Sequence, residues 1–195
     1  MVNFNYTKMK VKFKKLHEGA RLPEKATEGS AAYDLYVPED FIVEPGRTVI
    51  PLSFAMEMEQ GYEALIDPRS GFSCKGMEGY HVLTSFDHTM TSLLTYRDYL
   101  GARPEDNHVK RDEDTYLSQN PMRVDCDVIE GKIDSDFRKG VGVIVHSRDK
   151  RTFLIKAGTR IAQMTFHKVE TVQWEETEDL SETDRTGGFG STGIK

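Results

Sequence analysis

The C-terminal end of the chain combines residue types that can bind a phosphate group and an aromatic ring. Residues 185–193 read RTGGFGSTG, so they offer one guanidinium group, several glycines, one phenyl ring and hydroxyl groups. Glycines let successive backbone N–H groups turn toward phosphate oxygens, and a guanidinium group donates to such oxygens in a planar fork. No lysine directly follows the last glycine, so the ATPase chemistry of a Walker A loop is not implied. The same composition is typical of a flexible terminus, and the run alone does not decide between these two interpretations.

A second segment combines carboxylates with an aromatic residue in the pattern of a hairpin. Residues 131–140 (GKIDSDFRKG) predict a strand, a polar turn around Ser135 and Asp136, and a return strand that opens at Phe137. A carboxylate such as that of Asp134 can act as a general base when a water molecule lies within hydrogen-bonding distance. As hairpin chemistry alone, the segment is ordinary.

Three further segments carry polar residues of similar kinds next to predicted strands. They are residues 31–35 (AAYDL), 68–71 (PRSG) and 158–163 (GTRIAQ). Each has a purely structural interpretation, in which Asp34 is a turn residue, Arg69 and its neighbours begin a helix, and Arg160 is a surface cation beside a core strand. Taken singly, the structural interpretation is the simpler one. Taken together and in this order, the segments point to a shared site.

The elements that must position these residues have the composition of short β-strands. Residues 8–16 alternate lysines with apolar residues, which predicts a half-buried strand with a solvated lysine face rather than a phosphate-binding patch. Turn signals such as Pro45-Gly46 and Ala157-Gly158 separate the later strands. Those strands are predicted at 32–37, 41–43, 47–54, 62–66, 142–146, 152–155 and 160–169. Many short strands with frequent turns predict an all-β fold, a jelly-roll-like β-sandwich with little helix.

Residues 76–123 interrupt this rhythm and are interpreted as a largely non-β insertion. Met90, Leu93, Leu94 and Leu100 fall on helical spacing, which predicts a short surface helix that ends at Gly101. The histidines of this stretch match no common metal-ligand spacing, so no metal is assigned to them. The predicted organisation is a β domain over residues 1–180, interrupted at 76–123, followed by a flexible glycine-rich arm at 181–195.

Length and composition bound the class of protein. A chain of 195 residues fits one domain, and its net charge of −6 argues against nonspecific binding to nucleic acid. The two cysteines, Cys74 and Cys126, are too few for a disulfide framework. No apolar run approaches the roughly 20 residues that span a bilayer, and no secretory signal is recognised. We therefore expect a cytoplasmic protein that binds neither membrane nor nucleic acid.

Together, the five polar segments resemble the motif set of the homotrimeric dUTPases, the deoxyuridine triphosphate pyrophosphatases. The resemblance extends from about Val11 to Gly193, apart from the insertion. It implies hydrolysis of dUTP to dUMP and pyrophosphate, by attack of water on the α-phosphate with Mg²⁺. Such an activity limits uracil in DNA and supplies dUMP for thymidylate synthesis.

The resemblance also implies residue roles. Asp134 matches the catalytic aspartate that orients the attacking water, and Phe137 stands where the family usually has a tyrosine packed on the deoxyribose. Asp34 matches an acidic residue that holds Mg²⁺ through bound waters, as this ion prefers. Many members have Asn a few residues before the aspartate, where this chain has Val128. The implied substrate-binding residues are Arg69, Ser70, Gly71, Gly131, Ile133, Phe137, Gln163, Arg185, Phe189, Gly190, Ser191 and Thr192.

The family resemblance further implies a homotrimer whose active sites are shared between subunits, with the arm reaching a neighbour. Long insertions at this place are known in some bacteriophage members, so we expect a phage-type protein. The insertion is either a surface for another protein or a tolerated elaboration of the surface. Two other functions stay open, a dCTP deaminase with the same fold and a regulatory protein that keeps the nucleotide site as a switch.

Overall fold

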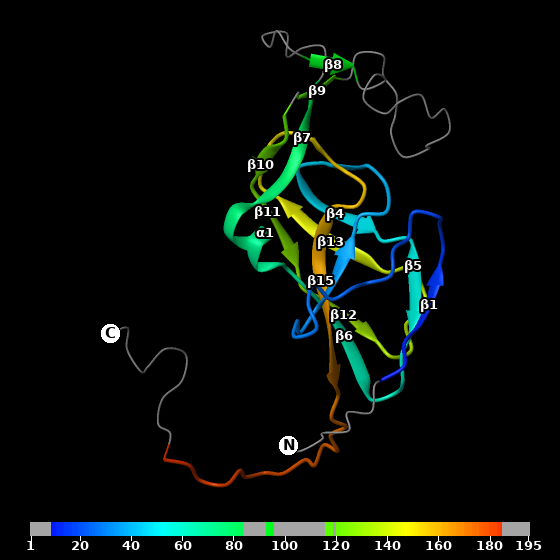
Figure 1. The fold of residues 1–195 in the computed structure, drawn as a ribbon. Coiled ribbons are helices and arrows are strands. Elements are labelled where there is room, and N and C mark those ends of the chain that lie inside the picture. Colours follow the sequence, from blue (N-terminus) through cyan, green and yellow to red (C-terminus); the bar gives the residue numbers. More distant parts are fainter. Residues whose placement is uncertain (1–8, 84–92, 96–115, 119, 185–195) are drawn as a thin grey trace.

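The computed structural model describes residues 9–83, 93–95, 116–118 and 120–184 of the chain. In this part the regular secondary structure is almost entirely β, and its one helix is α1 (Ser70–Lys75). The strands are β1 (Lys12–Lys15), β2 (Tyr33–Tyr36), β3 (Phe41–Val43), β4 (Gly46–Pro51), β5 (Phe54–Glu57), β6 (Tyr62–Asp67), β7 (Met77–Leu83), β8 (Leu93–Thr95), β9 (Tyr116–Ser118), β10 (Met122–Val124), β11 (Cys126–Ile129), β12 (Gly131–Asp134), β13 (Gly142–Ser147), β14 (Phe153–Ile155) and β15 (Arg160–Lys168). The expected all-β, jelly-roll-like fold is confirmed (Figure 1).

Alternation of side chains explains why these segments form strands. Along β13 each second residue, Val143, Val145 and Ser147, is buried while the residues between them are partly exposed. This strand pairs with β4 on one side and with β11 on the other, both antiparallel. The period of two places one face of the three-stranded sheet in the core.

A four-stranded sheet, in the order β12-β6-β15-β2, packs its apolar face against the same core. Ile66 pairs with Met164 on one side and lies opposite Gly131 on the other, so these positions share the inward face. The residues between them in sequence therefore point outward. This outward face carries Asp34, Glu63, Asp67, Lys132, Asp134, Gln163, Thr165 and His167.

A third sheet joins the body of the fold to the middle of the chain. It has the order β3-β14-β7-β9-β8, with β10 also paired to β7. All three residues of β14 are fully buried, so this strand lies at the centre of the packing. Gly79 permits a close approach here, because a Cβ atom would come within 2.7 Å of the Phe153 ring.

Several predicted elements differ from those observed. The helix expected around Met90 to Leu100 is wrong for its central part, because Leu93–Thr95 form β8, which pairs with β9. The return strand begins at Gly142 rather than at Phe137, and its hairpin partner is β11, because β12 turns away to pair with β6. Strand β7 lies within residues 76–123 and pairs with β10, which crosses the end of that range.

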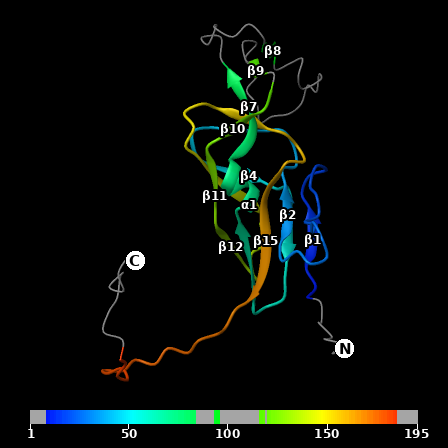
Figure 2. The same cartoon turned by 60° about the vertical axis from the view of Figure 1, so that its left-hand side comes forward.

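The chain leaves the body after β15. Residues 169–184 are exposed throughout and form no strand in the described structure. Figures 1 and 2 show this stretch running away from the sheets in both views. Within the described residues, no helix is long and apolar enough to cross a membrane.

Candidate active site

The first part of the candidate site is an ion-pair cluster centred on Asp34. The Asp34 side chain is buried, and its Oδ1 atom lies 2.8 Å from Nε of Arg69. Its Oδ2 atom accepts a hydrogen bond from Nη1 of Arg160 at 3.2 Å. Arg69 also donates from Nη1 to the backbone carbonyl of Arg160 at 3.3 Å. Two guanidinium groups and one carboxylate give this cluster a net positive charge, which suits it to an anion.

Strand register brings a glutamine and a second carboxylate beside this cluster. Gln163 of β15 lies directly opposite Asp34 of β2 and, on its other side, opposite Asp67 of β6. Residues opposite each other across antiparallel strands point to the same face. Asp67 accepts a hydrogen bond from Thr165 at 3.3 Å. Sequence reasoning missed Asp67, although its place just before the PRSG segment was a usable signal.

The segment after Asp67 carries the other predicted phosphate-binding residues. Arg69 caps α1 in an extended conformation without a side-chain capping bond, and Ser70 and Gly71 begin the helix. A Cβ atom built at Gly71 would meet nothing within 4 Å, so the space beside this residue is open. The helix start that we gave as the structural interpretation is therefore present, and it holds Arg69 at the Asp34 cluster.

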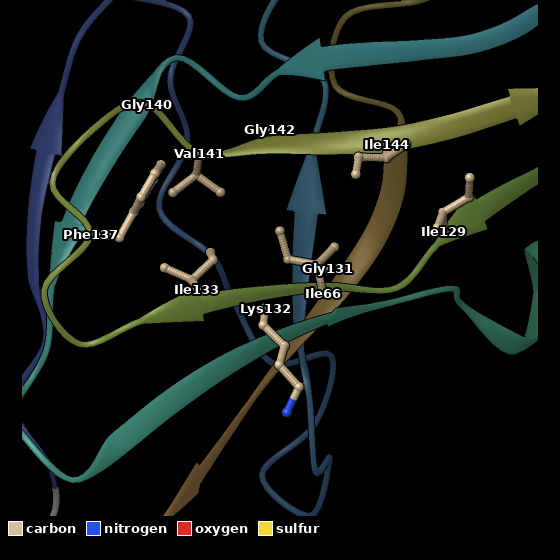
Figure 3. Close-up of a pocket in the computed structure, with 10 residues that line it drawn as sticks. All are labelled: Ile66, Ile129, Gly131, Lys132, Ile133, Phe137, Gly140, Val141, Gly142 and Ile144. Atoms are coloured by element: carbon tan, nitrogen blue, oxygen red, sulfur yellow. The ribbon is translucent and has the colours of Figure 1, made fainter. Parts of the chain in front are cut away.

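The second part is an apolar cavity of about 130 Å³ beside β12 (Figure 3). A cavity of about this size accepts a ring such as benzene when its lining is apolar. Gly131, Ile133 and Phe137, all predicted from sequence, line it. Its full lining consists of Ile66, Ile129, Gly131, Lys132, Ile133, Phe137, Gly140, Val141, Gly142 and Ile144.

The cavity owes its shape to glycines and to strand alternation. A side chain at Gly142, where β13 pairs with β4, would be crowded, because a Cβ atom would come within 2.8 Å of the Val49 side chain. A Cβ atom at Gly131 would meet nothing within 4 Å, so this position leaves space open. Figure 3 shows the Lys132 side chain pointing away from the apolar side chains, as alternation requires. Ile129 and Ile144 were missed because the sequence does not show that β11 and β13 pair beside β12.

Phe137 lines the cavity, whereas Asp134 lies outside its lining. Phe137 lines it and is 38% exposed as a residue, and its backbone N–H donates to the carbonyl of Asp134 at 3.1 Å. Arg138 holds the loop by donating to the carbonyls of Ser135 and Phe137. Asp134 itself is exposed at the end of β12 and does not line the cavity. Val128 is buried in the hydrophobic core and does not line the cavity.

A charged pair neighbours Asp134 on the outward face. Lys132 donates to both carboxylate oxygens of Glu63, at 3.1 and 2.8 Å. This hydrogen bond, with nearby carboxylates that include Asp134, raises the pKa of the Lys132 ammonium group. Lys132 therefore stays protonated near Asp134 at neutral pH.

The described part of one chain does not bring the two parts together. Gly131 and Ile133 belong to the inward face of the four-stranded sheet, whereas Asp34 and Gln163 belong to its outward face. Asp134 does share the outward face, but it pairs with Glu63, four residues from the Asp67 that pairs with Gln163. At about 3.3 Å per residue, this separation is roughly 13 Å along the strand.

Two further predictions concern metal and tail. The described residues contain no group of three or more His, Cys, Asp or Glu side chains that could hold a metal ion. Both oxygens of Asp34 already face guanidinium groups, so this donor set does not fit a resident Mg²⁺. The predicted residues of the arm, Arg185, Phe189, Gly190, Ser191 and Thr192, lie outside the described residues.

The dUTPase family model matches residues 18–86 and 124–193. The deoxyuridine 5'-triphosphate nucleotidohydrolase of Nautilia profundicola is 34% identical over 187 residues, which cover 95% of this chain and 99% of that protein. A solved structure of the Staphylococcus bacteriophage 80alpha dUTPase with dUpNHpp is 22% identical, with a TM-score of 0.64 and coverage of 95% and 99% of the two chains.

A variant dUTPase of the S. aureus phage phi11 has the same fold, at 18% identity and a TM-score of 0.57, with coverage of 87% of this chain and 97% of that chain. Its solved structure is described as revealing how a structural Mg(II) ion is coordinated. These two phage structures establish the shared fold. Since the family model covers well over half of the chain and a 34% identical relative is matched almost from end to end, the chain belongs to the dUTPase family.

Proposed function

We propose that this dUTPase-family enzyme hydrolyses dUTP to dUMP and pyrophosphate. The observation that carries the proposal is the pairing of an apolar cavity of ring size with a separate cluster of net positive charge in one fold. A pyrimidine nucleotide needs both environments, one for its base and sugar and one for its phosphates. Membership of the family supports dUTP as the nucleotide.

In this proposal the cavity binds the base and deoxyribose. Gly131 and Ile133 present backbone N–H and C=O groups along one wall, and the Phe137 ring packs on the sugar. A ribose 2′-hydroxyl is excluded by the ring, because Phe keeps the bulk of the family tyrosine. Apart from Lys132, whose side chain points away, the lining has no ionisable residue. This argues against a deaminase, which must move protons at the base.

Asp134 acts as the catalytic group in the proposed reaction. Its carboxylate orients a water molecule and accepts its proton as the water oxygen bonds to the α-phosphorus atom. The bond from that phosphorus to the bridging oxygen breaks, and pyrophosphate leaves with the electron pair. Arg69, Ser70, Gly71 and Gln163 donate to phosphate oxygens and stabilise the charge that develops on the leaving group.

The arm and the magnesium ion complete the proposal. Arg185 binds the γ-phosphate, Phe189 stacks over uracil, and Gly190, Ser191 and Thr192 add donors as the arm closes and excludes water. Mg²⁺ accompanies the triphosphate, as expected for an ion that favours phosphate oxygens and water. It is a companion of the substrate here, since the described residues offer no donor set for a resident ion.

We further propose a homotrimer with shared active sites. The placement of the cavity and the Asp34 cluster on opposite faces of one sheet supports this, because a single nucleotide cannot contact both in one chain. A second copy can supply the missing half. Residues 1–180 would form the β domain, and residues 181–195 the arm that reaches a neighbour.

The cellular role and the insertion follow from the same family assignment. Hydrolysis of dUTP limits uracil in DNA and supplies dUMP for thymidylate synthesis, which places the enzyme in the cytoplasm, or in the host cytoplasm for a phage-encoded protein. The phage structures of the same fold support a phage-type member. Residues 76–123 are the candidate surface for a protein partner.

The decisive experiment measures pyrophosphate release from dUTP, dCTP, dTTP and UTP with Mg²⁺, together with ammonia release. We expect release from dUTP alone, and Asp134→Asn should abolish most turnover while nucleotide binding persists. Asp136→Asn, in the adjacent turn, is the matched control and should keep turnover. Ammonia release from dCTP would establish the deaminase, and the absence of product from all four nucleotides would favour a regulatory binding protein.

A further inference from the structure

The carboxylate of Asp34 is engaged in a way that differs from metal binding. Its side chain is only 10% exposed, and each oxygen faces a different guanidinium group, Nε of Arg69 at 2.8 Å and Nη1 of Arg160 at 3.2 Å. A divalent cation approaching this carboxylate would meet repulsion from two positive charges. Instead, the Asp34 carboxylate holds the side chains of Arg69 and Arg160 in fixed directions.

Arg160 reaches Asp34 because β15 is irregular at its start. The pairing with β2 shifts register between Arg160 and Ala162, so an extra residue is inserted there. In a regular strand Arg160 would share the inward face of Ala162, as alternate residues do. The bulge instead buries the intervening residue, Ile161, completely and turns Arg160 outward. Bulges often redirect a side chain beside an active site.

The two arginines are held to different degrees. Arg69 uses Nε for Asp34 and Nη1 for the backbone carbonyl of Arg160, and its side chain is 27% exposed. Arg160 is 48% exposed, and its ion pair with Asp34 employs Nη1. A guanidinium group has five N–H donors in a fixed plane, so Arg160 has donors to offer to a further anion.

We propose that Asp34 is a positioning residue for two arginines rather than a metal-holding residue, and that Arg160 is a second cationic group for the phosphate chain of the nucleotide. Gln163 lies opposite Asp34 on the same face, so amide and guanidinium donors converge on one side of the sheet. The inference rests on the proposed function, because it takes nucleotide phosphates as the ligand.

The test separates a metal effect from an arginine effect by measuring affinity with and without metal. The probe is the non-hydrolysable analogue dUpNHpp, titrated calorimetrically into the full-length protein in EDTA and again in Mg²⁺. We expect Asp34→Asn and Arg160→Gln each to weaken binding by about 10- to 100-fold in both buffers, the usual effect of losing a charged hydrogen bond. Arg160→Lys should recover part of the affinity, since it keeps the charge but loses the planar fork.

Arg148→Gln is the matched control. Arg148 also bonds two carboxylates, those of Asp125 and Asp127, and its side chain is 52% exposed, but it lies outside the candidate site. Its substitution should leave affinity unchanged. Thermal unfolding checks the fold of each variant, and Arg160→Gln carries the test if Asp34→Asn does not fold.

Three outcomes would overturn the inference. A loss for Asp34→Asn that appears only with Mg²⁺ would return this residue to a metal-holding role. Wild-type affinity for Arg160→Gln in EDTA would remove Arg160 from the phosphate site. Both results can occur in a protein that hydrolyses dUTP, so they reject the inference alone. Failure of the wild-type protein to bind the analogue and to hydrolyse dUTP would reject the proposed function as well.

Discussion

A side chain added at Gly131 should separate ligand binding from folding. Gly131 lines the apolar cavity, shares the inward face of the sheet with Ile133, and has nothing within 4 Å of the position that a Cβ atom would take. Its backbone is not in the left-handed region. Gly131→Ala should therefore fold without strain and should gain about 0.4–1 kcal/mol in the free energy of unfolding, because the unfolded chain loses freedom. Urea unfolding measures this gain.

A larger side chain at the same position should fill the space meant for the nucleotide. Valine suits a strand, so Gly131→Val should still fold. Its methyl groups would take up a substantial part of a cavity of about 130 Å³. Forcing a ligand into an overfilled site costs about 1–3 kcal/mol, which corresponds to a loss of about 5- to 150-fold in kcat/KM for dUTP.

The assay is steady-state pyrophosphate release over a range of dUTP concentrations. Gly29→Val is the matched control, because Gly29 also has nothing within 4 Å and lies outside the cavity lining. Unchanged kcat/KM in Gly131→Val would mean that base and sugar bind elsewhere. Unfolding of Gly131→Val would mean that the space beside Gly131 is not open, which would refute the geometric argument itself.

Two further predictions concern buried titratable groups. Burial, with the nearby Arg151 charge, lowers the pKa of His81 in the folded protein. The unfolded chain therefore takes up a proton at His81 more readily than the folded protein does. Neutral His81 thus contributes to stability fully above about pH 6.5, and this contribution is lost as the pH falls toward the folded pKa. The free energy of unfolding should decline below that pH, and His81→Asn should reduce the decline; an equal decline in the variant would contradict the assignment. Burial raises the pKa of the Cys126 thiol to about 12, whereas Cys74 is exposed. Iodoacetamide at pH 8 should therefore label Cys74 alone, as detected by mass spectrometry. Early labelling of Cys126 would disprove its burial.

Strands with clear local alternation were the easiest to predict. The segment 142–146 was predicted as a strand, and it forms nearly all of β13, with each second residue buried. Strand β7 was missed, and its partner β14 is distant in the sequence. Strand β11 was missed because the expected hairpin placed residues 131–134, rather than 126–129, beside the return strand. The helical spacing around Leu93 was misleading, since pairing with β9 outweighed the local pattern.

Some residues of the candidate site could be predicted from the sequence, and others could not. Residue types were readable from short motifs, and Gly131, Ile133 and Phe137 all line the cavity. Ile144 was not predicted for the site, because its membership depends on how β12 and β13 diverge. Arg160 was given only a structural interpretation, since nothing local to the 158–163 segment reveals the bulge that turns it outward.

The sequence by itself determined the β-rich class, most strand positions and the kinds of group available for nucleotide chemistry, because side-chain alternation and turn residues act over a few neighbours. Only the tertiary structure decided that Asp34 meets Arg69 and Arg160, and that the cavity and this cluster occupy opposite faces of one sheet. Those relations depend on strand register, and the paired residues Asp34 and Gln163 are more than a hundred residues apart in the sequence. A shift of one residue in that register would turn each side chain to the other face.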